Sequence, residues 1–287
     1  MNYNDAKNKY IKNALLFEVS NFKISRELKM YTDELYKKID DYIKSKYLNG
    51  VLIGNKKALE KEIDEIIIKS FKKMDNYLIA EMSTVYKVES VAAASILKNQ
   101  IGKRMNKDLT TDNLTKSISN TRDIIKSNKF YTVEFTKFKK DIHTNILKNV
   151  TYTLINSKTY IEAAKLISKS NMASGLKTSQ VQTLSRTMMK NVQNDAVINT
   201  IKEADIEYVK LIGIMDVRQT DSCRSLSNKV FRIDDAPPLP LHYNCRSTYV
   251  SIPPWEVETA KRDLMSFKDW YKKNKNDPDL KRLKYMY

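Results

Sequence analysis

The chain has 287 residues, and its 51 Lys and Arg residues outnumber its 34 Asp and Glu residues to give a formal net charge of +17. Hydrophobic residues make up 41% of the sequence, which is enough for a sizeable core and excludes a wholly disordered polycation. The longest apolar stretch, residues 90–97, is far shorter than the roughly 20 residues that cross a bilayer, and the N-terminus lacks a signal-peptide core. We therefore expect a folded, basic protein made in a cytoplasm, without a membrane span.

The first two thirds of the chain carry a helical pattern. All six prolines lie at Pro237 or later, so no proline interrupts the preceding residues. Apolar residues recur at spacings of three or four over residues 28–43, 59–78 and 135–154, with a break where Asn and Gly adjoin at residues 49–55. These stripes predict long amphipathic helices that need partners to cover them.

Two further helices have start signals. Thr159 with Glu162, and Ser179 with Gln182, have the spacing of capping boxes, in which two side chains satisfy the first N–H groups of a helix. We expect a helix near residues 160–171 and a longer one near 179–203.

From Tyr208 onward the periodicity changes from helix to strand. Three short runs rich in β-branched residues, at 208–215, 229–233 and 248–252, predict a small β-rich module. Pro253 and Pro254 end it, and the remaining tail is predicted as helix to about Asn274, followed by a Lys-rich extension.

The predicted fold class is α+β, mainly α: an elongated helical body, then the small β-rich module, then a C-terminal helix and tail. The expected domains are a helical body at residues 1–156, further helices with the β-rich module at 157–254, and a C-terminal helix with a basic tail at 255–287.

The positive charge is concentrated in the helical part. Residues 201–255 include seven basic and seven acidic residues, whereas residues 1–200 include 35 basic and 21 acidic residues. Such an excess favours non-specific binding to polyanions such as double-stranded DNA, because Lys and Arg displace counterions from phosphates without reading the sequence. A solvated Lys-rich surface with no nucleic-acid partner explains the same charge equally well.

Both cysteines and one of the two histidines fall within residues 216–247. Cys223, His242 and Cys245 are three zinc-type ligands, and Asp216 or Asp221 could supply a fourth. The same side chains could instead be a structural cluster of buried thiols and a hydrogen-bonded histidine. A Cys/His nucleophile pair is a third interpretation, which we rank last because neither cysteine lies at a predicted helix N-terminus. We predict that the three side chains converge, with metal possible and catalysis improbable.

This segment resembles the C-terminal motif of the Mu F-like head morphogenesis family, the minor head proteins of tailed phages. The family pattern is Asp-x-Arg-Thr, then Cys-Arg-x-Leu-x-Gly-x-x-Phe, then Pro-x-His-Pro-Asn-Cys-Arg-Cys. The positions that match it here are Asp216, Arg218, Cys223, Arg224, Leu226, Val230, Phe231, Pro240, His242, Asn244, Cys245 and Arg246. With residues 184–187 and 191–196, which are similar to the family's Arg-Thr-Glu helix, the resemblance covers about residues 157–252.

Four positions depart from the family pattern. Asn228 replaces the usual Gly, although Asn also tolerates positive φ, and Tyr243 replaces a common Pro. Ser247 stands where the family often has its last Cys, and Met188 stands where Glu is expected. The lost Cys weakens a zinc site, and the lost Glu argues against an obligatory acid there. The remaining residues suit a structural role: Asp216 and Arg218 can pair, Arg246 can bind carbonyls or a carboxylate, and Asn244 can cap a loop.

The resemblance implies a minor structural protein of a bacteriophage head. Such a protein would lie inside the capsid near the portal vertex and the packaged DNA, contact the portal or the major capsid protein, and act in head morphogenesis or genome delivery. It would not be an enzyme. The alternatives from other classes are a zinc-dependent hydrolase or nuclease, and a non-specific DNA-binding protein that is not part of a virion.

Overall fold

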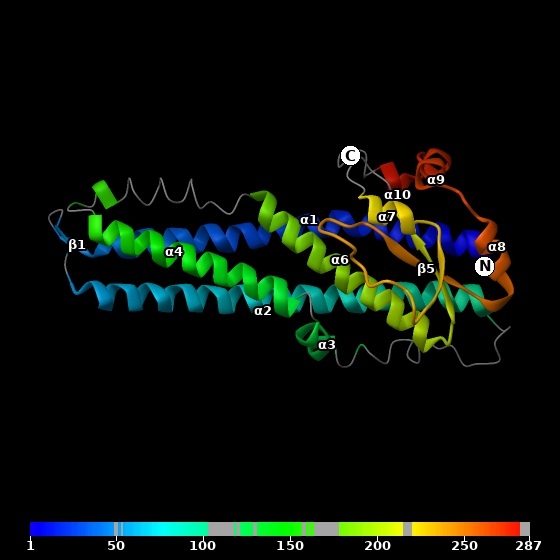
Figure 1. The fold of residues 1–287 in the computed structure, drawn as a ribbon, viewed down its shortest axis with the longest axis horizontal. Helices are drawn as coiled ribbons and strands as arrows, with labels where there is room; N and C mark the ends of the chain where they lie inside the picture. Colours follow the sequence, from blue (N-terminus) through cyan, green and yellow to red (C-terminus); the bar gives the residue numbers. More distant parts are fainter. Residues whose placement is uncertain are drawn as a thin grey trace. The chain divides into compact units, whose positions relative to one another are not determined.

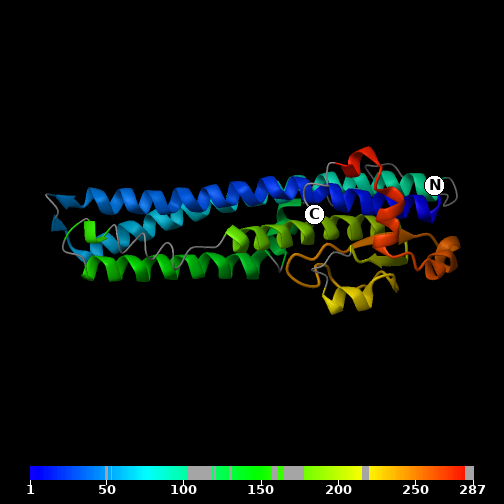
Figure 2. The same cartoon turned by 90° about the horizontal axis from the view of Figure 1, so that it is seen from above.

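The computed structural model describes residues 1–48, 51–52, 54–102, 118, 121–128, 131–156, 159, 161–163, 178–214 and 220–281. Figure 1 shows the elements coloured along the chain, and Figure 2 shows them from above. The helices of the first two thirds are α1 (Tyr3–Ser45), α2 (Lys56–Ile101), α3 (Thr121–Ser127), the π-helical turn η3 (Tyr131–Phe135), α4 (Thr136–Asn156) and α6 (Thr178–Glu203).

The remaining elements are short. Two antiparallel strands of two residues each, β1 (Tyr47–Leu48) and β2 (Val51–Leu52), lie between α1 and α2 in the chain. The elements after α6 are β3 (Tyr208–Ile212), α7 (Asp221–Leu226), β4 (Val230–Arg232), β5 (Thr248–Ile252), η4 (Pro254–Glu256), α8 (Val257–Arg262), α9 (Phe267–Asn274) and α10 (Pro278–Lys281). The protein is therefore mainly α-helical with a small antiparallel sheet, which confirms the predicted fold class.

The chain divides into two compact units. Unit 1 contains residues 1–23, 81–126 and 183–287, and unit 2 contains residues 24–80 and 127–182. Both α1 and α2 contribute one part to each unit. The three domains expected along the sequence stay a prediction.

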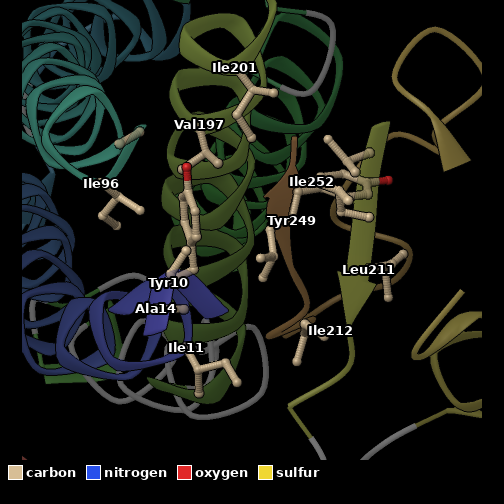
Figure 3. Close-up of a cluster of buried hydrophobic side chains, with 14 of the residues drawn as sticks. Tyr10, Ile11, Ala14, Ile96, Val197, Ile201, Leu211, Ile212, Tyr249 and Ile252 are labelled. Carbon is tan, nitrogen blue, oxygen red and sulfur yellow. The ribbon is translucent and has the colours of Figure 1, made fainter. Parts of the chain in front are cut away.

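Unit 1 has a core to which distant parts of the sequence contribute. Its buried side chains come from the start of α1, the end of α2, the end of α6, and the sheet, as Figure 3 shows for ten labelled residues. Tyr10, Ile96, Val197, Leu211 and Ile252 are examples, each at most 4% exposed. Burial of such side chains contributes about 1.5–3 kcal/mol each. The β-rich module therefore shares its core with α1, α2 and α6.

The three-stranded sheet has the order β4-β3-β5, and both pairings are antiparallel. Central Val209 pairs with Phe231 on one side and Ser251 on the other. All five residues of β5 are buried, so this strand is covered on both faces. The three strands predicted from alternation and β-branched residues are confirmed.

The C-terminal segment is fastened to the start of α1. The carboxylate of Asp263 accepts hydrogen bonds from the hydroxyl of Tyr3 at 3.1 Å and from the ammonium of Lys7 at 2.6 Å. Farther along, the indole N–H of Trp270 donates to the side-chain oxygen of Asn8 at 2.6 Å. Lys7 is only 3% exposed, so its ion pair with Asp263 is shielded from solvent.

The single helix expected from Trp255 to about Asn274 is wrong. The chain forms η4 and α8, leaves the helical conformation at residues 263–266, and starts again as α9. The break has a local cause, because the hydroxyl of Ser266 accepts the N–H of Asp269 and so caps α9 as a new helix. The predicted end at Asn274 is confirmed.

Unit 2 is built from α1, α2 and α4 around an apolar cluster. The buried members of that cluster are Leu35, Ile39, Ile43, Leu59, Ile63, Ile67, Phe71, Ile142, Ile146, Val150 and Ala163. Polar contacts accompany this core between α2 and α4: Nε2 of His143 lies 2.5 Å from Asp64, and Lys139 pairs with Asp75 at 2.8 Å. The three predicted apolar stripes are thus the buried faces of these helices.

The remaining sequence predictions have mixed outcomes. The helix expected near 179–203 is α6, whereas most of the helix expected near 160–171 lies outside the described residues. Its capping box is present, since Thr159 and Glu162 exchange hydrogen bonds. Among the described helices, none is both long enough and apolar enough to cross a membrane.

Shortening Ile11 tests whether α1 is part of the same core as the β-rich module. Ile11 is fully buried, so Ile11→Ala should lower the free energy of unfolding of unit 1 by about 2–5 kcal/mol. Trp255 and Trp270 both lie in unit 1, so tryptophan fluorescence during denaturation reports on it.

Val88→Ala is the matched control, because Val88 on α2 is 59% exposed and its truncation should change stability by less than about 0.5 kcal/mol. Equal effects of the two substitutions would contradict the shared core.

Candidate metal centre

Two thiols and one imidazole meet in unit 1. The sulfur of Cys223 lies 3.0 Å from Nε2 of His242 and 3.6 Å from the sulfur of Cys245. All three potential ligand atoms lie within 4.8 Å of one another. The predicted convergence of these side chains is therefore present in the structure, although metal binding itself stays a prediction.

Cys223 is positioned by the short helix α7. The hydroxyl of Thr220 caps this helix by accepting the N–H of Cys223, which places the thiol in the first turn. The expectation that neither cysteine lies at a helix start is thus wrong for Cys223. The Thr220-x-x-Cys223 spacing is the local signal, because Thr favours the N-cap position.

His242 and Cys245 lie in the loop between β4 and β5, and α6 holds that loop in place. The hydroxyl of Thr187 accepts the backbone N–H of Asn244 at 3.0 Å. The amide of Asn191 donates to the carbonyl of Leu239 at 2.9 Å, and that of Asn194 donates to the carbonyl of Ser247 at 3.3 Å.

We call Thr183, Thr187, Asn191 and Asn194 the α6 polar stripe. Their spacings of three and four residues put them on one face of the helix. Thr183 completes the set by accepting a hydrogen bond from the side chain of Asn244 at 3.2 Å. The loop's backbone groups thus find hydrogen-bond partners on a helix, which lets an irregular segment be buried.

Two asparagines adopt the left-handed backbone conformation that the loops of this module need. Asn228 has a φ of 65° and Asn244 a φ of 59°. Asn tolerates this region better than most residues with a side chain, so Asn228 performs the turn expected of the family's Gly. The prediction for Asn228 is confirmed. Asn244 combines its positive φ with the two hydrogen bonds to α6.

Buried charges surround the loop. Arg246 lies 4.0 Å from the carboxylate of Glu18 on α1, and both side chains are about nine-tenths buried. Lys190 on α6 is 1% exposed and donates to the side-chain oxygen of Gln193 at 2.7 Å. Burial lowers the pKa of Lys190 and raises the pKa of nearby Glu89. The attraction between the two opposite charges offsets part of each pKa shift. Removing one member alone would leave a buried charge without its partner.

The two thiols are electrostatically unequal. A hydrogen bond from the Cys223 thiol, together with backbone hydrogen bonds from Leu241 and Ser247, lowers the pKa of Cys245. The same thiol contact and burial raise the pKa of Cys223. The arrangement stabilises one thiolate, the form in which cysteine binds metal.

The donor set fits a zinc ion. Tetrahedral Zn²⁺ with sulfur ligands at about 2.3 Å separates two sulfurs by roughly 3.8 Å, close to the 3.6 Å observed here. Nδ1 of His242 lies 2.7 Å from the carbonyl of Tyr243 and donates to it, which leaves Nε2 with its lone pair toward the sulfurs. Cys223, His242 and Cys245 could therefore hold zinc, which would tie α7 to the loop.

Asp221, one of the two residues expected as a fourth zinc ligand, does not lie at the cluster. Its side chain is 99% exposed and pairs with Arg224 at 3.2 Å, so it is not directed at the cluster in this structure. Asp216, the other candidate, lies outside the described residues, as does Arg218. The hydroxyl of Ser247 lies 3.4 Å from the sulfur of Cys223, at the position where the family pattern often has its last Cys.

The other motif residues support the loop from the apolar side. Leu226 and Phe231 pack against the core of unit 1, and the Leu239-Pro240 peptide bond is cis. Arg246 binds a carboxylate, as predicted, and Asn244 holds the loop backbone. Sequence reasoning missed the α6 polar stripe, although its regular spacing of Thr and Asn was a visible signal.

Zinc binding and its dependence on position 247 can be measured directly. The full chain should retain one zinc per molecule after dialysis, and Cys223→Ser should lose it. Ser247→Cys should bind zinc more tightly, because a third thiolate would replace water or a hydroxyl at the fourth position. Competition with a chromophoric chelator measures each affinity.

Ser225→Cys is the matched control, because it adds a thiol at an exposed position of α7 without changing the ligand set. Equal amounts of bound zinc in the wild type and in Cys223→Ser would contradict the proposed zinc site. Equal zinc affinities of Ser247→Cys and Ser225→Cys would also contradict it.

Comparison with known proteins gives one match. The family model described as Phage Mu protein F like protein matches residues 144–250, which is less than half of the chain but includes the whole Cys/His cluster and the α6 polar stripe. Comparisons with curated proteins and with solved structures gave no match. Residues 144–250 are therefore a Phage Mu protein F-like region, and the resemblance predicted from the sequence is confirmed.

Proposed function

We propose that this protein is a minor structural component of a bacteriophage head, which acts in head morphogenesis or genome delivery. The observation that carries the proposal is the Phage Mu protein F-like region at residues 144–250. In this proposal the protein lies inside the capsid, close to the portal vertex and the packaged DNA. Its protein partner is the portal or the major capsid protein.

The geometry of the Cys/His cluster favours a structural role over catalysis. Both ring nitrogens of His242 are engaged, one with the sulfur of Cys223 and one with the carbonyl of Tyr243. Cys223 and Cys245 are each 2% exposed, so neither residue is presented to a substrate. A general base or nucleophile needs access to the reacting group, and this cluster is arranged to tie two segments together.

A zinc-dependent hydrolase or a nuclease is the alternative from another class. Within the described residues, Cys223, His242 and Cys245 are the one group of three or more potential ligands whose donor atoms meet. Two-metal phosphodiester cleavage uses clustered carboxylates to hold its ions, and this group contains none. The donor set therefore supports at most one metal ion, and the burial of both cysteines favours a structural role for that ion.

The charge of the chain suits an environment filled with DNA. The net charge of +17 favours binding to the phosphate backbone, which requires no sequence recognition. A DNA-binding protein that is not part of a virion would share this property, so charge alone does not separate the two functions.

Mass spectrometry of purified phage particles separates them. We expect the protein to co-purify with intact particles through a density gradient, at a copy number far below that of the major capsid protein. Particles emptied by a chelator or osmotic shock show whether the protein leaves with the DNA. Absence from particles, with abundance in the host lysate, would contradict the proposal and favour the DNA-binding alternative.

A further inference from the structure

A groove in unit 2 lies between α2 and α4 and has a volume of about 410 Å³. Its charged and titratable lining residues are Lys72 and Asp75 from α2, with Lys139, Lys140 and His143 from α4. Most of this surface lies before residue 144, so it belongs mainly to the part of the chain outside the Phage Mu protein F-like region.

The carboxylates beside the groove already have close polar partners. Asp75 accepts hydrogen bonds from Lys139 at 2.8 Å and from the hydroxyl of Tyr131 at 3.1 Å. Asp64, about three helical turns away on α2, lies 2.5 Å from Nε2 of His143. Lys139 therefore offsets the charge of Asp75, and the partners of both carboxylates are residues other than Lys72 and Lys140.

The remaining lysines have no such partners. Lys72 and Lys140 are exposed, line the groove from opposite helices, and form no ion pair with a described residue. Further exposed lysines lie near the groove on the solvent-facing sides of the two helices: Lys61, Lys69, Lys137 and Lys148. The exposed carboxylates near them are Glu62, Glu65 and Asp141.

The spacing of the lysines suits an extended polyanion. Lys137 and Lys148 are eleven residues apart on α4, or roughly 16 Å at 1.5 Å per residue, and Lys140 lies between them. One strand of DNA carries a phosphate about every 3.4 Å, so this row faces about five phosphates. Lysines on flexible stems can follow a duplex without reading its bases.

We propose that this lysine-lined groove between α2 and α4 binds the phosphate backbone of double-stranded DNA. The proposal rests on the proposed function, which brings packaged DNA to the protein. An acidic protein partner fits less well, because hot spots of protein interfaces are enriched in aromatic residues and Arg, and the exposed residues that line the groove include neither. Ile68 is the one large apolar side chain that the lining of the groove exposes.

The test uses the full chain and a triple variant, Lys72→Gln with Lys137→Gln and Lys140→Gln. Binding to two unrelated DNA duplexes is measured over a series of salt concentrations. Each phosphate contact contributes about 0.9 to the slope of log affinity against log salt, so losing three contacts should lower the slope by about 2–3. The reduction should be the same for both duplexes, because the contacts are not sequence-specific.

The matched control is Lys87→Gln with Lys98→Gln and Lys268→Gln. It removes the same charge from exposed lysines of unit 1, and it should leave the slope nearly unchanged. Circular dichroism and thermal unfolding establish that both triple variants fold. Equal losses in the two variants would overturn the proposal in favour of net charge alone.

A parallel titration with poly-glutamate addresses the acidic-protein alternative. If the groove variant keeps its DNA affinity and loses poly-glutamate binding, the groove is a protein-binding surface and the proposal is overturned. Failure of the wild-type chain to bind DNA also overturns it. None of these outcomes affects particle association, so the groove and the proposed function can fail separately.

Discussion

The structure of the Phage Mu protein F-like region depends on one interaction: the polar stripe of α6 binds the backbone of the loop that carries His242 and Cys245. Thr187 and Asn194 each bridge α6 to this loop, and each also donates a hydrogen bond within its own helix. Because these groups are buried, the hydrogen bonds cannot be exchanged for water without cost. These hydrogen bonds therefore hold the loop in place, with His242 and Cys245 close to Cys223.

The need to bury this loop and the sheet also explains why the small β-rich module packs against long helices. The sheet has three strands, β5 is buried along its whole length, and the core around it includes helices that begin far away in the sequence. Arg246 follows the cysteine loop and meets Glu18 of α1 in a shielded ion pair. Three elements thus hold the Cys/His cluster in place: α7, the α6 polar stripe, and α1.

Much of this could be predicted from the sequence, because helix and strand periodicities are local. The apolar stripes, α6, the three strands and the positive φ of Asn228 all follow from residue types at fixed spacings. The break at residues 263–266 was missed because the continued helical pattern concealed the cap at Ser266. The convergence of Cys223, His242 and Cys245 was predicted, but Asp221 was misplaced because its pairing with Arg224 depends on rotamers. The α6 polar stripe was missed because burial of Thr and Asn depends on a partner distant in sequence.

Cobalt substitution tests the central claim, because Co²⁺ reports its geometry and its thiolate ligands in its optical spectrum. The wild-type chain should give a tetrahedral spectrum with thiolate charge transfer at one Co²⁺ per molecule. Thr187→Val with Asn194→Leu should weaken Co²⁺ binding by about 10–100-fold, the usual effect of losing groups that orient ligands. Asn199→Leu is the control, since Asn199 lies on α6 but donates to Tyr86 instead of the loop. Equal affinity in all three proteins, or an octahedral spectrum in the wild type, would contradict the account.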